Sequence, residues 1–282
     1  MAQSSVPSSM RTAISLLTRP RRMPVMAPWN WFSALLAGWL RGGLSPSAVH
    51  VIDPHPSDWL MGTGVAVNGP LPEAPAVVLV AVKPQMMGAA LPQLAAMGGG
   101  RTLFVSIAAG TTIATFEGVL GAGTRLVRAM PNTPAAIGRG ITAIVGNSQA
   151  TAADLDMAEG LLSAVGQVVR LDAESQIDAV TAVSGSGPAY VFHLIEALAA
   201  AAEAEGLSPE LSMRLAKATV GGAGQLAEDA AEDPAQLRIN VTSPGGTTAA
   251  ALAVLMDAET GFPALLKRAV KAAADRGREL GK

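Results

Sequence analysis

The feature that most constrains the fold is an alternation of short apolar segments with longer helix-like segments between about residues 33 and 172. Residues 77–82 form an unbroken Val, Leu and Ala run, which is typical of a strand buried on both faces. Segments 34–40 and 152–165 have the length and the Ala and Leu content of helices. This alternation predicts βαβ units and therefore an α/β domain with a mainly parallel sheet.

The rest of this region follows the same pattern. Further strands are predicted at residues 49–52, 102–107, 126–130, 141–145 and 167–171, and further helices at 86–97 and 112–120. The C-terminal ends of parallel strands form one edge of a sheet, and α/β proteins bind their ligands at that edge. The segments that directly follow the strands are therefore the candidate binding residues.

After about residue 172 the strand-like segments stop. Helical patterns cover residues 173–183, 189–205, 209–230, 246–257 and 263–280. Residues 190–204 are apolar around most of the helix circumference, which is typical of a deeply buried helix or a subunit interface. We therefore predict an α/β domain over residues 1–172 and an all-helical, oligomerising domain over residues 173–282.

Composition excludes several classes of protein. The chain has no cysteine, so a disulfide scaffold, a thiolate metal site and a cysteine nucleophile are excluded. A formal net charge of -2 argues against a nucleic-acid partner. No apolar run approaches the roughly 18 residues of a membrane-spanning helix, and the three histidines are too scattered for a metal site. We expect a cytoplasmic protein that binds a small molecule.

Two charged residues lie at predicted strand ends. Lys83, followed by Pro84, comes directly after the buried strand, where bare backbone amides and a cation would suit the phosphates or ribose of a dinucleotide. A proline turn with a solvated lysine is the simpler alternative. Asp53 ends another strand and would bind the hydroxyls of an adenosine ribose, or would simply cap the turn before Pro54.

The segment MPNTP at residues 130–134 places Asn132 between two prolines. The prolines restrict the backbone on either side of one amide side chain, which both donates and accepts hydrogen bonds. Such a group suits the carboxamide of a nicotinamide, and an Asx-type turn is the equally weighted alternative.

The segment NVTSPGGTT at residues 240–248 is the most informative. Gly245 and Gly246 bring backbone N–H groups to a predicted helix N-terminus, where the helix dipole favours an anion. No histidine or carboxylate lies close in sequence to activate a nucleophile, so the loop suits binding of a small carboxylate and not hydrolysis. A capped structural loop is the alternative. The segment SGSGP at residues 184–188 allows the same two interpretations.

Taken in order, these segments resemble the pyrroline-5-carboxylate reductases. The resemblance runs from about Ser33 to the C-terminus and rests on AVKPQ at 81–85, SIAAG at 106–110, RAMPNTPA at 128–135, VSGSGPAY at 183–190 and NVTSPGGTT at 240–248. It implies a Rossmann-like N-terminal domain followed by an all-α dimerisation domain. It also implies a homodimer, which can assemble into a ring of dimers. The implied reaction is reduction of 1-pyrroline-5-carboxylate to L-proline by hydride transfer from NADPH or NADH, the last step of proline biosynthesis.

The resemblance also implies roles for individual residues. Contacts with the dinucleotide are expected from Asp53, Asn68, Ala81, Val82, Lys83, Pro84, Ile107, Ala108, Ala109, Asn132 and Asn240. The substrate is expected near Ser186, Ser243, Gly245, Gly246, Thr247 and Thr248, with its carboxylate on the backbone amides of the last three. The hydroxyl of Thr248, the catalytic candidate, would hydrogen-bond the ring nitrogen and assist its protonation. Because the cofactor carries the reducing electrons, the protein needs orientation more than a strong base.

Two other functions are open at this stage. One is a cofactor-deficient homologue that serves only as a helical dimerisation partner. The other is a related dehydrogenase for a different imino or hydroxy acid, against which the 240–248 loop argues.

The first 32 residues depart from the family's pattern. The glycines of the expected GxGxMG loop would fall at Ala27, Trp29 and Phe32, and the best preceding strand, 23–26, contains a proline. The charged residues before Asp53 are all arginines, as in a transit peptide. A transit peptide, however, would precede the first strand and would not replace it. We therefore interpret this segment as a damaged or frame-shifted cofactor half-site, which resequencing of the locus would test.

The missing glycines predict weak binding of NAD(P)H. Bulky side chains in this loop would fill the space of the pyrophosphate, and Pro28 has no N–H to donate. Fluorescence titration of the purified chain is expected to show weak or no binding, and weaker binding of NADPH than of NADH because the charge of Asp53 repels a 2′-phosphate. A micromolar dissociation constant would contradict the first expectation, and a tenfold preference for NADPH the second.

Overall fold

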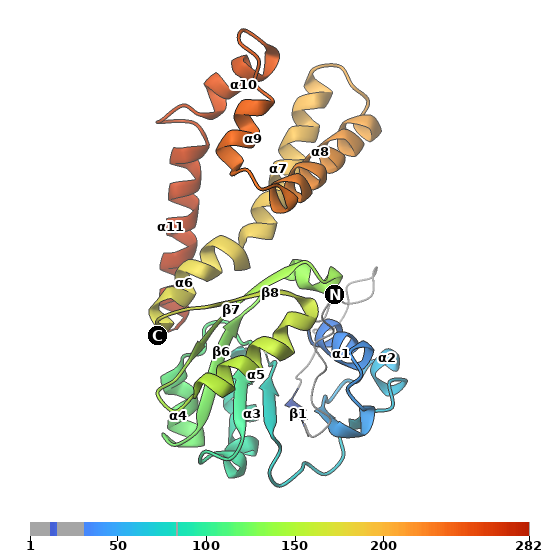
Figure 1. Ribbon diagram of the computed structural model, residues 1–282, viewed down its shortest axis with the longest axis vertical. Coiled ribbons are helices and arrows are strands. Elements are labelled where there is room, and N and C mark those ends of the chain that lie inside the picture. Colours follow the sequence, from blue (N-terminus) through green and yellow to red (C-terminus); the bar gives the residue numbers. More distant parts are fainter. Residues whose placement is uncertain (1–11, 16–30, 83, 282) are drawn as a thin grey trace. The chain divides into compact units, whose positions relative to one another are not determined.

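The computed structural model describes residues 12–15, 31–82 and 84–281. Contacts divide the chain into two compact units. The first comprises Met1–Gly185 with Asp275–Lys282, and the second comprises Ser186–Ala274. Residues 173–185, which the sequence-based division placed in the helical domain, belong to the first unit by their contacts. The two units are described in turn (Figure 1).

The first unit is built on an eight-stranded sheet. Its strands are β1 (Thr12–Ser15), β2 (Val49–Ile52), β3 (Ala66–Val67), β4 (Val77–Val80), β5 (Leu103–Ser106), β6 (Arg125–Met130), β7 (Gly140–Gly146) and β8 (Gly166–Arg170). They lie in the order β3-β2-β1-β4-β5-β6-β7-β8, and each neighbouring pair is parallel except β6 and β7. The predicted mainly parallel sheet is confirmed. From β3 to β6 all strands point the same way, so their C-terminal ends share one edge.

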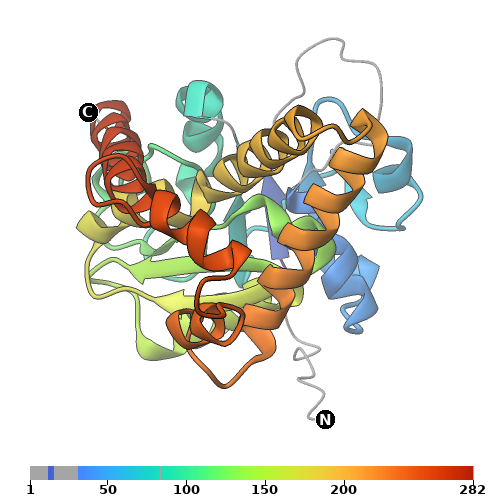
Figure 2. The same ribbon diagram turned by 90° about the horizontal axis from the view of Figure 1, so that it is seen from above.

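Helices cover both faces of this sheet. They are α1 (Trp31–Arg41), α2 (Asp58–Met61), α3 (Met87–Leu94), α4 (Ile113–Leu120), α5 (Ala152–Leu162) and α6 (Ile177–Val180). Val77 and Leu79 of β4 belong to the core beneath α1 and α5, whereas Val78 and Val80 belong to the core beneath α3 and α4. Figure 2 shows these two pairs of helices on opposite sides of the strands. Burial on both faces explains why β4 is continuously apolar.

Helix α1 joins the core through one apolar stripe. Phe32, Leu35, Leu36 and Trp39 follow helical spacing and are at most 2% exposed. The indole Nε1 of Trp39 donates to the carbonyl of Leu161 at 2.7 Å. Leu161 lies in the last turn of α5, where carbonyls have no partner within the helix. Trp39 therefore both packs and completes the hydrogen bonding of a neighbouring helix end.

The first strand differs from the sequence-based prediction. We expected it at residues 23–26, but β1 is Thr12–Ser15 and pairs with β2 on one side and β4 on the other. A strand between two neighbours needs donors on both sides, and Pro24 provides none, whereas Thr12–Ser15 includes β-branched Thr and Ile. Residues 16–30 lie outside the described part of the chain.

The second unit is helical. Its helices are α7 (Gly187–Ala204), α8 (Pro209–Asp229), α9 (Pro234–Asn240), α10 (Thr247–Leu255) and most of α11 (Phe262–Leu280). Helix α9 was not predicted. Its start carries a clear signal, because Asp233 accepts a hydrogen bond from the amide of Gln236 at 2.8 Å and Pro234 occupies the first helical turn. The predicted helix at 173–183 is instead a short 3-10 turn, α6 and a π-helical turn at Thr181–Gly185.

Few side chains of the second unit are buried. Those buried among its described residues are small, such as Ala199, Ser212 and Ala216. Large apolar side chains stay exposed on its helices, among them Phe192 at 60% and Leu226 at 56%. A helical unit with so little core of its own needs another surface to cover these side chains.

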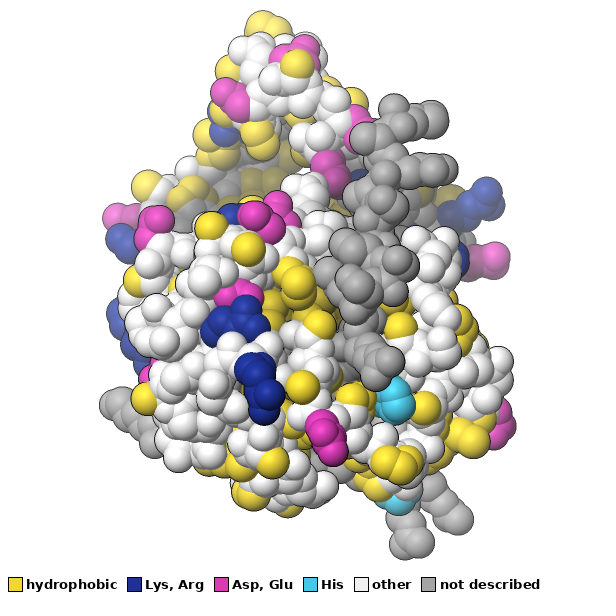
Figure 3. Space-filling view, turned by 60° about the horizontal axis from the view of Figure 1, so that its bottom comes forward, with side chains coloured by type: hydrophobic (Ala, Val, Ile, Leu, Met, Phe, Trp, Pro, Cys, Tyr) yellow, Lys and Arg dark blue, Asp and Glu magenta, His cyan; other side chains and the backbone are white. Residues whose placement is uncertain are grey.

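Charged side chains of both signs lie on the surface of the protein. On the face shown in Figure 3, basic and acidic side chains are interspersed among the described residues, without a broad basic area. In the described part of the chain, no helix combines the length and the apolar character needed to cross a membrane.

The Trp39 contact generates a stability prediction. Trp39→Phe removes the bond to Leu161 and leaves a small cavity, so we expect a loss of about 1–3 kcal/mol in the free energy of unfolding. Trp59→Phe is the matched control, because Trp59 is 44% exposed and its replacement should cost no more than about 0.5 kcal/mol. Urea unfolding followed by circular dichroism measures both. Equal losses for the two variants would contradict the assigned role of Trp39.

Candidate active site

The C-terminal ends of the parallel strands bring most of the predicted cofactor residues to one edge of the sheet. Asp53 follows β2, Asn68 follows β3, Ala81 and Val82 follow β4, Ile107, Ala108 and Ala109 follow β5, and Asn132 lies just beyond β6. Lys83 lies outside the described residues. Pro84 begins an exposed 3-10 turn, Pro84–Met86. This edge is the expected ligand-binding side of a doubly wound sheet.

Asn68 holds Asp53 in place. The Asn68 side chain accepts from the amide of Asp53 at 2.9 Å and donates to its carbonyl at 2.8 Å. Asn68 has a φ of 54°, a left-handed conformation that asparagine tolerates better than most residues. Asp53 is 9% exposed, and its Oδ1 accepts from the amide of His55 at 2.9 Å. Asp53 therefore caps its turn, as the alternative interpretation had it.

The ends of β4 and β5 offer backbone, not side chains. Val82 and Ala108 are 3% and 4% exposed, and both side chains belong to the core beneath α3 and α4. The amide of Ile107 donates to the carbonyl of Val80 at 3.1 Å, and the amide of Ala108 donates to the hydroxyl of Ser106 at 3.2 Å. The exposed backbone of Ala109 is the part of this loop that remains for a ligand.

The side-chain oxygen of Asn132 makes a hydrogen bond within the protein. Its Oδ1 accepts from the amide of Ile141 at 2.9 Å, which ties the loop after β6 to the start of β7. This is a bond across the loop and not the Asx-type turn of the structural alternative, because the Asn132 side chain makes no capping bond to the turn that follows it. The Nδ2 hydrogens are left to donate to a ligand such as a carboxamide oxygen.

The position of the Phe32 side chain differs from the one predicted for the phosphate loop. We expected its ring to fill the space of the pyrophosphate, but it is 1% exposed and belongs to the core beneath α1. The expectation is wrong because α1 already begins at Trp31, which places Phe32 on the buried stripe of the helix. The other two glycine positions, Ala27 and Trp29, lie outside the described residues.

In the second unit, a tight turn precedes α10. The amide of Gly246 donates to the carbonyl of Ser243 at 3.1 Å, with Pro244 and Gly245 between them. Gly245 has a φ of 68°, so this is a type II turn, which favours glycine at that position. A Cβ on Gly246 would lie 2.4 Å from the hydroxyl of Ser243. The positive φ therefore favours glycine at position 245, whereas a side chain at position 246 would require the Ser243 hydroxyl to move.

This turn exposes amides at the start of α10. Gly246 is the N-cap, no side chain caps the helix, and the first helical bond runs from the amide of Ala250 to the carbonyl of Gly246. The amides of Thr247, Thr248 and Ala249 are therefore left without partners in the helix. The amide of Gly246, which we expected to hold a carboxylate, already donates to the carbonyl of Ser243 within the turn. The amide of Ala249, which was not among the predicted site residues, has no partner within the helix.

Ser186 and Asn240 are also in the second unit. Ser186 is the N-cap of α7 but makes no capping bond with its side chain. Asn240 is the exposed last residue of α9, and its Oδ1 accepts from Gln236 at 2.7 Å. Asn240, for which a cofactor contact was predicted, therefore lies in a different unit from the residues at the strand ends.

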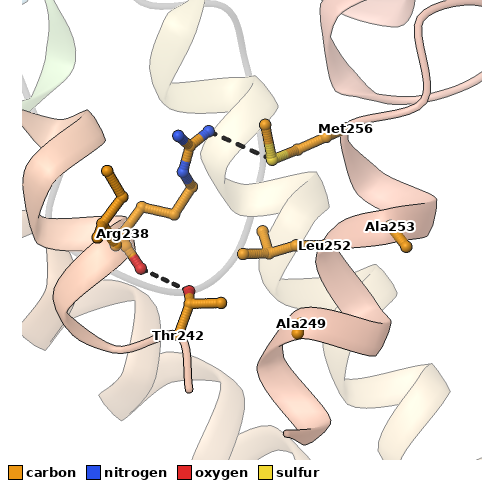
Figure 4. Close-up of a pocket in the computed structure, with 7 residues that line it drawn as sticks. Arg238, Thr242, Ala249, Leu252, Ala253 and Met256 are labelled. Atoms are coloured by element: carbon orange, nitrogen blue, oxygen red, sulfur yellow. Dashed lines mark hydrogen bonds between the residues drawn. The ribbon is translucent and has the colours of Figure 1, made fainter. Parts of the chain in front are cut away.

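A groove of about 410 Å³ lies between α9 and α10. In Figure 4 the side chain of Arg238 reaches Met256, and the hydroxyl of Thr242 donates to the Arg238 carbonyl at 2.6 Å. The guanidinium donates to the sulfur of Met256 at 3.2 Å. Met256 follows the last residue of α10, so this cation lies at the helix end opposite the exposed amides. Arg238 joins α9 to α10 and does not extend the anion site.

The described residues contain no group of three His, Asp or Glu side chains that would hold a metal ion.

Comparisons with known proteins identify the family. A family model described as pyrroline-5-carboxylate reductase dimerisation matches residues 174–280. The pyrroline-5-carboxylate reductase of Pseudomonas aeruginosa is 41% identical over 265 residues, which cover 92% of this chain and 96% of that protein. The chain belongs to the pyrroline-5-carboxylate reductase family.

Solved structures of this family have the same fold. The reductase of Coxiella burnetii is 33% identical and superimposes with a TM-score of 0.85 over 95% of this chain and 98% of that one. The structure of the Plasmodium falciparum reductase with NADP bound is 26% identical, with a TM-score of 0.78 over 98% of this chain and 99% of that one. The predicted Rossmann-like fold with a helical C-terminal domain is therefore confirmed.

Proposed function

We propose that the chain reduces 1-pyrroline-5-carboxylate to L-proline with NADPH or NADH, as an oxidoreductase of the family to which it belongs. The observation that carries this proposal is the set of unpartnered amides at the start of α10, beside the hydroxyl of Thr248. The likeness to the Pseudomonas reductase extends through both units, so a purely structural dimerisation partner is not favoured.

The amides of Thr247, Thr248 and Ala249 hold the substrate carboxylate in this proposal. They lie in the first turn of a nine-residue helix, where the dipole is favourable to an anion. The turn that ends at Gly246 lets a ligand approach closely, because neither Gly245 nor Gly246 has a side chain in the way. Ser243 and Ser186 remain candidates for further contacts with the substrate.

Thr248 is the proposed catalytic residue. Its side chain lies next to the carboxylate-binding amides and is half-buried. Its hydroxyl would accept a hydrogen bond from the protonated ring nitrogen, or would donate to the neutral nitrogen and help to deliver a proton. A protonated imine accepts hydride more readily, so the role of Thr248 is to orient and polarise the C=N bond.

The described residues at the sheet edge fit a dinucleotide. The carboxylate of Asp53, whose backbone is held by Asn68, suits ribose hydroxyls. The exposed residue Ala109 allows close approach, and the Nδ2 group of Asn132 suits a carboxamide. A bound nicotinamide cofactor supplies the hydride. The charge of Asp53 supports a preference for NADH.

A homodimer follows from the exposed apolar helices of the second unit. This unit coincides with most of the region matched by the dimerisation model. A second copy of the chain would cover side chains such as Phe192 and Leu226 and supply the core that the unit lacks. Assembly of dimers into a ring and a cytoplasmic location stay predictions.

The role of Thr248 is tested by paired substitutions. Thr248→Ala removes the hydroxyl and is expected to lower kcat/KM for 1-pyrroline-5-carboxylate by about 10- to 100-fold. Thr248→Ser keeps the hydroxyl and should retain most of the activity. Steady-state oxidation of NADH by both variants measures the effect. Full activity of Thr248→Ala would contradict the assigned role, and a folded wild-type dimer with no turnover would instead support the structural partner.

The dimer interface is tested by adding one charge. Phe192→Asp would bury a carboxylate among apolar side chains, so we expect it to yield monomers in light scattering after size-exclusion chromatography. Ile137→Asp is the matched control, because Ile137 is 67% exposed in the first unit and should stay dimeric. A dimer in both variants would place the interface elsewhere.

A further inference from the structure

Strand β6 carries an arginine-carboxylate pair near each end. Near its C-terminal end, Arg128 Nη1 lies 2.5 Å from Glu174 Oε1, and the two side chains are 7% and 29% exposed. At its N-terminal end, Arg125 Nη1 lies 2.7 Å from Asp154 Oδ1, and these side chains are 29% and 4% exposed. The pairs are chemically alike and similarly shielded, but only the first lies at the ligand-binding edge of the sheet.

Each carboxylate also contacts the start of a helix. Asp154 Oδ2 accepts from the amide and the hydroxyl of Thr151 at the start of α5. Glu174 makes the corresponding contact at the ligand-binding edge. Its Oε1 also accepts from the amide of Ile113 at 2.8 Å. Ile113 is the first residue of α4, so the carboxylate satisfies an amide that has no helical partner and lies at the favourable end of the helix dipole. One carboxylate oxygen therefore joins the start of α4 to strand β6.

The contacts of Glu174 hold the C-terminal end of the loop at residues 107–112. The near end is fixed where the amide of Ile107 donates to the carbonyl of Val80. The far end is fixed where the amide of Ile113 donates to Glu174. Arg128 is the register partner of Ser106, the last residue of β5 before this loop.

We propose that Glu174 and Arg128 are positioning residues for the cofactor. They hold the 107–112 loop and the strand end that leads to Asn132 in the geometry that the dinucleotide requires. This inference rests on the proposed function of the sheet edge. Without the carboxylate, a guanidinium that is 7% exposed loses its partner, and the first amide of α4 loses its acceptor. Both losses fall next to the loop.

Substitutions of the two carboxylates that pair with the arginines of β6 can be compared directly. Glu174→Ala is expected to speed amide hydrogen exchange in residues 107–113 of the cofactor-free protein and to weaken NADH binding by about tenfold. Its KM for 1-pyrroline-5-carboxylate should stay unchanged. Glu174→Gln should show smaller effects, because the amide oxygen still accepts from Ile113 and Arg128. Asp154→Ala should lower the melting temperature without changing exchange at 107–113 or NADH affinity.

The outcomes separate positioning from general stability. Unchanged exchange at 107–113 in Glu174→Ala, or equal loss of NADH affinity in Asp154→Ala, overturns the proposal. If Glu174→Ala does not fold, Glu174→Gln carries the same comparison. If the wild-type chain neither binds nor oxidises NADH, the proposed function fails. Hydrogen exchange then still decides whether Glu174 anchors the loop.

Discussion

Burial of β4 on both faces is the constraint on which the first unit depends. Alternate side chains of Val77–Val80 belong to separate cores beneath α1 and α5 and beneath α3 and α4. A strand covered in this way must be reached by crossover connections, which keep its neighbours parallel. Parallel strands in turn deliver their following loops to one edge. The grouping of Asp53, Ala81, Ile107 and Asn132 is thus a consequence of the two cores, although these residues are far apart in sequence.

The second unit differs from the first in how little of its apolar surface is buried within it. Its helices bury little beyond small residues and leave large apolar side chains exposed, so its stability as a folded unit depends on a covering surface. Its candidate substrate loop is nevertheless locally defined. The turn from Ser243 to Gly246 and the start of α10 are fixed by backbone hydrogen bonds and a positive φ, which do not require a partner. The amides proposed to bind the anion are therefore set by local geometry, whereas the surrounding helices expose apolar surface that the proposed dimer would cover.

Sequence reasoning succeeded where a physical pattern was long or chemically distinctive. The apolar run of β4 and the glycines of the α10 turn both signal their structures directly. It failed where the pattern was short: β1 has four residues, and α9 has only an Asp-Pro start to mark it. Sequence reasoning could not predict hydrogen bonds between residues that are far apart in the chain. The commitment of Asn68 to Asp53, and of Glu174 to both Arg128 and Ile113, depends on which strands lie side by side.

The candidate site also explains why its motifs consist of glycine, proline and hydroxyl residues. Its proposed tasks are to hold an anion, polarise a C=N bond and orient a cofactor, and backbone amides with one hydroxyl suffice for these. Ionisable side chains such as Asp53 and Glu174 act largely by fixing backbone, and each accepts from a main-chain amide. A site of this kind is sensitive to changes that alter the path of the backbone, including the loss of a charged group that holds it. Phe32 is an example. This bulky residue stands at a glycine position, but its side chain packs in the core beneath α1 and does not fill the phosphate loop.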